Sequence, residues 1–130
     1  SNKNYANSKA LLKASKKGTT VDVRELLDTN ADVNYSTHGF SPLKYTIKHY
    51  LNMRDNSNMA DFRYSYLQII ESMLKKCSAR NACSCIQYLD EMCKGYNTSS
   101  IRQLLVDKAT QVLTKKQYTT ANCIYSIILY

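Results

Sequence analysis

The sequence predicts an all-α fold assembled from short helix–turn–helix units. The chain of 130 residues contains 3 Gly and 1 Pro, and a β-sandwich or barrel usually needs many more turn residues than that. Apolar side chains recur at helical spacing in short segments, and polar turns separate these segments. The length suits a single domain over residues 1–130, because a chain of this size can build one core.

The first unit is predicted over residues 8–34. Its first helix ends at Gly18, and its second helix is expected to present Val21, Val23, Leu26 and Leu27 on one broad face. A helix of about 8 to 10 residues is only marginally stable alone in water. We therefore expect this unit to stack on a neighbour and to share one elongated core with it.

A hairpin and a new helix are expected after the first unit. The stretch 35–40 is polar and contains the turn residue Gly39, which predicts a hairpin. Ser41 is a favourable helix cap and Pro42 suits the first helical turn, so a helix is expected to begin there.

Three runs in this part of the chain resemble the ankyrin repeat. They are the Leu-Leu pair at 26–27, the Ala-Asp-Val-Asn run at 31–34 and the Ser-Pro-Leu-Lys run at 41–44. Leu11 and Leu43 lie 32 positions apart, close to the family period of about 33. The resemblance implies an ankyrin-repeat solenoid of three to four helix–turn–helix units.

The later units follow the same pattern with one insertion. Residues 69–81 repeat the second helix and its terminal Asn, so the second unit is predicted over 35–81. It includes a long, Asn-rich insertion at 51–64, expected as a loop or as an extension of the helix before it. A third unit is predicted over 82–112, and a partial or capping unit over 113–130.

The apolar positions of the expected helices predict the core. They recur every three or four residues, so within each helix they share one face. The predicted core residues are Leu11, Ala14, Val23, Leu26, Leu27, Leu43, Ile47, Ile70, Met73, Leu74, Leu104 and Leu105.

The five cysteines predict neither a disulfide framework nor a metal site. An odd number, with four of them between Cys77 and Cys93, is unlike the even, dispersed set of a small secreted domain. We expect reduced thiols and a cytoplasmic protein. The spacing lacks the cysteine pairs that zinc sites use, so no metal and no cofactor is expected.

The sequence does not predict an enzyme. His38 and His49 are the only histidines, and no Gly-x-Ser-x-Gly, His-Glu-x-x-His or phosphate-binding Gly loop occurs. The acidic residues Asp90 and Glu91 are adjacent on an expected helix and therefore point to different sides. We expect a protein without catalytic residues.

The resemblance implies non-catalytic protein binding. Ankyrin arrays most often hold partners with the hairpin tips and the exposed face of the first helices. At the matching positions, and on the insertion, this chain has Lys16, Lys17, Thr37, His38, Phe40, Lys48, His49 and Arg54. The formal net charge of +8 favours an acidic partner.

The composition also resembles that of ankyrin arrays from particular kinds of organism. A divergent array rich in Asn, Lys and Tyr is similar to those of large DNA viruses and of bacteria that live inside eukaryotic cells. The resemblance therefore implies an effector or viral protein that engages a host factor. Such a protein would act in the cytoplasm or nucleus of the host cell.

A basic helical module that binds nucleic acid is the alternative. The chain has 11 Tyr, and Tyr45 with Lys44 and Lys48 offers a ring for base stacking beside two cations. The basic residues are dispersed along the chain, which makes nucleic acid the less favoured partner. No apolar run reaches the roughly 18 residues of a membrane span, so we expect no membrane insertion. We also expect a monomer.

Overall fold

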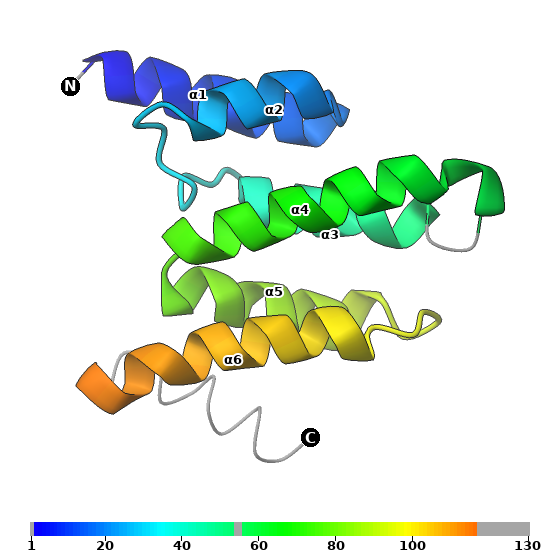
Figure 1. Cartoon of the computed structure of the whole chain (residues 1–130). Coiled ribbons are helices and arrows are strands. Elements are labelled where there is room, and N and C mark those ends of the chain that lie inside the picture. Colours follow the sequence, from blue (N-terminus) through cyan, green and yellow to red (C-terminus); the bar gives the residue numbers. More distant parts are fainter. Residues whose placement is uncertain (1, 54–55, 117–130) are drawn as a thin grey trace. The chain divides into compact units, whose positions relative to one another are not determined.

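Helices make up the regular structure of the described part of this chain. The computed structural model describes residues 2–53 and 56–116, and within them lie six α-helices, one 3-10 helix and no β-strand (Figure 1). This confirms the predicted all-α class. The helices are α1 (Asn2–Lys17), α2 (Thr20–Leu27), α3 (Pro42–Met53), η1 (Ser57–Met59, the 3-10 helix), α4 (Ala60–Lys76), α5 (Ala79–Met92) and α6 (Ser99–Lys116).

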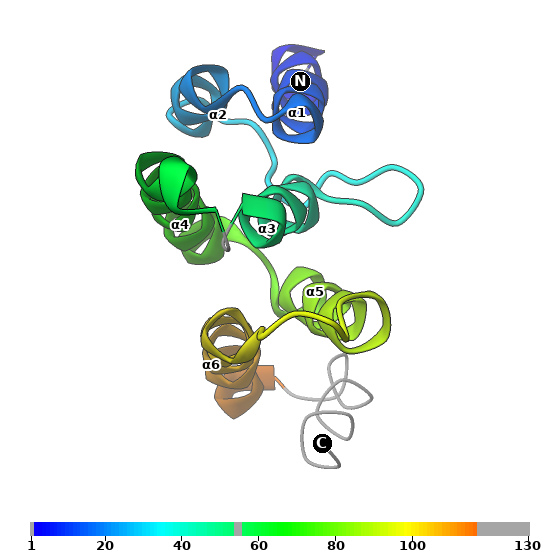
Figure 2. The same ribbon diagram turned by 90° about the vertical axis from the view of Figure 1, so that its right-hand side faces the viewer.

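The chain divides into two compact units, Ser1–Lys76 and Cys77–Tyr130. The first unit contains two helical hairpins, α1–α2 and α3–α4, which pack on one another as two layers (Figure 2). In this packing α1 contacts α3, and α2 contacts α4.

The core of the first unit agrees with the predicted list. Leu11, Leu43, Ile47, Ile70 and Met73 have no exposed surface, and the other predicted apolar positions of this unit are buried as well, with one exception. The exception is Leu26, which is only half-buried. Leu26 therefore lies at the edge of the core.

A left-handed glycine joins α1 to α2. Gly18 has φ +80°, and the amides of Gly18 and Thr19 both donate to the carbonyl of Ala14, at 2.9 and 3.1 Å. A Cβ on Gly18 would lie 2.7 Å from Oη of Tyr66 and 3.3 Å from Cε1 of His49. The turn thus requires glycine both for its backbone angle and for the space that it leaves.

The second hairpin caps the helix ends of the first. Nε2 of His49 lies 2.8 Å from the carbonyl oxygen of Lys16, and Oη of Tyr66 donates to the carbonyl of Gly18 at 3.1 Å. Nζ of Lys76 donates to the carbonyl of Leu27, at the last residue of α2. Carbonyls at a helix C-terminus have no partner within their own helix. In this unit, α3 and α4 supply those partners from side chains.

The predicted insertion is mostly helical. Residues 51–53 belong to α3, and α4 begins at Ala60, so only residues 54–59 separate the two helices. Asn56 caps η1, because its side chain accepts a hydrogen bond from the amide of Asn58 at 3.0 Å. The Asn-rich stretch 51–64 therefore lengthens both helices of the second hairpin instead of forming one long loop.

The second unit is built on the hairpin α5–α6. Oγ of Ser78 caps α5 by accepting from the amide of Asn81 at 3.1 Å. Arg102 of α6 forms two hydrogen bonds with the carboxylate of Asp90 on α5, at 3.1 and 3.2 Å. Of the predicted core residues in this unit, Leu105 is buried and Leu104 is half-buried. Beyond Lys116, the predicted unit 113–130 lies outside the described residues.

Candidate partner-binding surface

A tight hairpin precedes α3 and forms a projecting finger (Figure 2). The amide of Thr37 donates to the carbonyl of Phe40 at 3.1 Å, and the amide of Phe40 donates back at 3.0 Å. The two residues between them, His38 and Gly39, have φ of 54° and 79°. Positive φ at both central residues is the type I′ geometry that matches the twist of a two-residue hairpin. The hairpin expected at 35–40 is therefore present, with His38 and Gly39 at its tip.

Lys44 fixes this finger to the first turn of α3. Its side chain is buried, with 8% of its surface exposed, and its Nζ donates to the carbonyl of Gly39 at 2.6 Å. The same Nζ lies 5.3 Å from the centre of the Phe40 ring. Ser41 caps the helix by accepting from the amide of Lys44 at 3.2 Å. The ammonium group of Lys44 thus stabilises the finger from within, a role that the sequence did not reveal.

Phe40 is the centre of a group of rings and cations. Its ring lies 4.7 Å from that of Tyr45, and the Nζ of exposed Lys48 lies 5.9 Å from its centre. Both lysines lie within the range of cation–π attraction. We call His38, Phe40, Lys44, Tyr45 and Lys48 the finger cluster. Within this cluster the side chains of His38 and Lys48 are exposed, and Phe40 is half-buried.

The predicted binding residues do not all belong to this cluster. Helices α1 and α3 run in the same direction, so Lys16 and Lys17, which end α1, lie far from the finger at the start of α3 (Figure 1). His49 lies beside them, with Nε2 on the carbonyl of Lys16 and its ring stacked on Tyr66 at 5.8 Å. His49 is therefore engaged inside the first unit. Thr37 contributes its backbone to the hairpin, and Arg54 lies outside the described residues.

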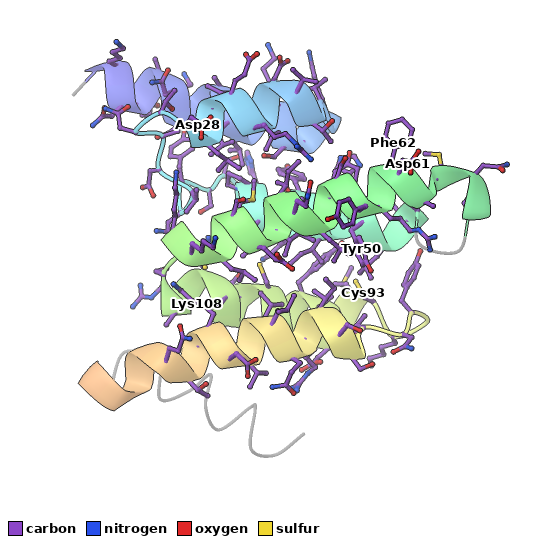
Figure 3. The ribbon with its side chains drawn as sticks, viewed as in Figure 1. Asp28, Tyr50, Asp61, Phe62, Cys93 and Lys108 are labelled. Carbon is purple, nitrogen blue, oxygen red and sulfur yellow. The ribbon has the colours of Figure 1, made fainter. Side chains whose placement is uncertain are left out.

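A polar groove runs between α2 and α4, and the sequence did not predict it. Its volume is about 630 Å³, and one of its lining residues is Asp28, just past the end of α2 (Figure 3 labels Asp28). Nη2 of Arg24 donates to Oε1 of Gln68 across it at 3.0 Å. The charged groups that line the groove are of both signs, so the groove does not favour a ligand of one particular charge. The lining residues are Arg24, Leu27, Asp28, Gln68, Ile69, Glu71, Ser72, Lys75 and Lys76.

Three buried cysteines in the described part of the second unit carry thiols outside any disulfide. Cys77, Cys85 and Cys93 are not disulfide-bonded, and burial raises the pKa of both Cys77 and Cys93 (Figure 3 labels Cys93). Cys83 is disulfide-bonded, which corrects the expectation that all five cysteines are reduced. A raised pKa leaves less thiolate, the nucleophilic form, at neutral pH.

The described residues hold no group of three or more His, Cys, Asp or Glu side chains placed to bind a metal ion. None of the helices in the described part combines the length and the apolar character needed to cross a bilayer. Comparisons with protein-family models, with curated proteins and with solved structures return no match.

Proposed function

We propose that this chain is a non-catalytic protein-binding module of the ankyrin-repeat type, and that its finger cluster contacts an acidic segment of a partner protein. The order of elements in the first unit supports the repeat assignment. A helix, a left-handed Gly turn and a second helix are followed by a two-residue hairpin, after which a new helix pair begins.

The starts of α3 and α5 support the same assignment. Ser41 caps α3 and Ser78 caps α5, each by accepting from the amide three residues later. The residues at those amides, Lys44 and Asn81, are polar and equally buried, each with 8% of its surface exposed. A capping serine followed by a buried polar residue thus recurs at the point where a repeat would begin.

The arrangement of the finger cluster carries the proposal. The type I′ turn and the Lys44 bond to Gly39 hold the finger in one conformation, so little conformational entropy is lost when a partner binds. The Nζ of exposed Lys48 lies 5.9 Å from the centre of the half-buried Phe40 ring, so a cation and an aromatic ring lie next to each other. Together they suit a segment that carries a carboxylate next to an apolar side chain.

Binding without catalysis fits the chemistry of these groups. The finger cluster contains one histidine and no serine, cysteine or carboxylate, so it lacks the nucleophile and orienting group of a hydrolytic site. The net charge of +8 would speed the approach of an acidic partner by long-range attraction.

A pull-down with matched variants tests the proposal. The full chain and the variant Phe40→Ala/Lys48→Glu would be used as bait in eukaryotic cell lysate treated with nuclease. Lys75→Glu is the control, because it makes the same charge change at an exposed lysine of α4. We expect proteins that bind both the wild type and Lys75→Glu, and that the finger variant no longer retains.

The purified protein found in this way would then be titrated against all three chains. Loss of an aromatic contact and reversal of one charge should weaken binding by about tenfold to a hundredfold. Equal binding by the finger variant would refute the assignment of the surface. A parallel pull-down from untreated lysate would test the nucleic-acid alternative. Recovery that is seen only without nuclease, together with affinity that falls steeply with salt, would favour that alternative.

A further inference from the structure

A second surface of the first unit lies on the hairpin α1–α2, away from the finger. It is a hollow of about 390 Å³, and every residue that lines it belongs to α1, α2 or the turn between them. No residue of α3 or α4 takes part. The hollow therefore opens on the side of this hairpin that the second hairpin leaves uncovered.

Charges of opposite sign face each other across the hollow. Lys13 and Lys17 lie one turn apart on α1, and Asp22 and Glu25 lie three residues apart on α2. All four side chains are exposed. Among the described residues, none of the four forms a salt bridge or a side-chain hydrogen bond. The hairpin thus carries a basic row and an acidic row that its own fold leaves unpaired.

Small and apolar side chains lie between the two rows. Ala14 and the half-buried Leu26 line the hollow. Ala10 and Ala6 precede Ala14 at intervals of four residues, so they continue the same face of α1. Alanine at these positions allows another helix to approach closely, because no long side chain holds it away.

We propose that two copies of this chain associate through the α1–α2 face. A two-fold axis would set the basic row of each copy against the acidic row of the other, so that one surface is complementary to itself. The charge complementarity carries this inference, since a single face supplies both signs in equal number. It departs from the monomer expected from the sequence, and it is independent of the finger cluster.

The size of the face predicts a weak and salt-sensitive dimer. Helices of 16 and 8 residues offer little area compared with a standard interface. The ion pairs would be exposed at the rim, where salt screens them. Association should therefore depend on protein concentration and should be lost at high ionic strength.

Sedimentation velocity of the full chain tests the proposal. Samples from about 20 µM to about 1 mM cover the affinity that a small interface gives. At about 50 mM salt, the mean mass should rise with concentration toward twice that of the monomer, and about 500 mM salt should abolish this rise. A wild-type chain that stays monomeric at every concentration in low salt would overturn the inference.

Two charge-reversal variants identify the surface. Lys13→Glu/Lys17→Glu makes both rows acidic, and Asp22→Lys/Glu25→Lys makes both rows basic. Each variant alone should self-associate at least about tenfold more weakly than the wild type, and an equimolar mixture should form one-to-one dimers. Lys75→Glu, which alters α4, should dimerise like the wild type. Self-association of either reversal variant at the wild-type level would show that another surface is responsible.

Discussion

Replacing Gly18 with alanine should destabilise the first unit more than the same change at Gly39. Both glycines have nearly the same left-handed backbone, with φ of 80° and 79°. They differ in their surroundings, because a Cβ at Gly18 would lie 2.7 Å from Oη of Tyr66, whereas a Cβ at Gly39 would meet nothing within 4 Å. The two substitutions therefore share the backbone cost and differ in the steric cost.

The expected magnitude follows from these contacts. An alanine held in the left-handed region costs about 1 to 2 kcal/mol at either position. At Gly18 the phenol of Tyr66 must also move away, which breaks its hydrogen bond to the Gly18 carbonyl at a cost of about 1 kcal/mol or more. We expect Gly18→Ala to lower the free energy of unfolding by about 2 to 4 kcal/mol, against about 1 to 2 kcal/mol for Gly39→Ala.

Urea denaturation followed by circular dichroism would measure both values in the full chain. A third variant, Tyr66→Phe, removes the hydroxyl that the new Cβ would meet. In that background, Gly18→Ala should cost about 1 kcal/mol less than in the wild type. Equal costs at Gly18 and Gly39, within about 0.5 kcal/mol, would refute the steric argument.

Three further predictions concern single contacts. His38→Asn should raise the free energy of unfolding by about 0.5 to 1 kcal/mol, because Asn-Gly suits a type I′ turn better than His-Gly does. Urea denaturation would measure this gain, and a value equal to that of the wild type would contradict the type I′ assignment. Asp90→Asn should lower the free energy of unfolding by about 1 to 2 kcal/mol, since Arg102 loses its paired carboxylate. An unchanged midpoint of urea denaturation would contradict this. Burial, and then interaction with Cys93, raises the pKa of Tyr88 to about 12. An ultraviolet titration should therefore show one phenol that ionises near pH 12 and is absent in Tyr88→Phe. Because this pKa lies above the ordinary value of 10.0, its contribution to stability is present below pH 10.0 and is lost as the pH rises toward 12.

The helices and most of the core could be predicted from the sequence, because both depend on the local spacing of apolar residues. Leu11, Leu43 and Ile70 follow helical spacing and are fully buried. Leu26 follows the same spacing and is only half-buried, because burial also depends on whether a neighbouring helix covers that face. The insertion was harder to interpret, since a polar composition does not distinguish an exposed helix from a loop.

The finger was predictable in position and less so in chemistry. Gly39 and the Ser-Pro start of α3 marked the hairpin and the helix in the sequence. The burial of Lys44 was not marked, because a lysine is ordinarily exposed and only the three-dimensional path of the finger brings the Gly39 carbonyl to its Nζ. His49 likewise looked like a surface residue, and its bond to Lys16 joins residues 33 positions apart.

The capping of α1 and α2 by side chains of α3 and α4 has a consequence for how this protein opens. If the second hairpin detaches, the carbonyls of Lys16, Gly18 and Leu27 lose their protein donors at the same moment. The first hairpin then loses its packing surface and its helix-end partners together. Amide hydrogens of α1 and α2 should therefore exchange with solvent in one joint event with those of α3 and α4, as a single foldon rather than as two.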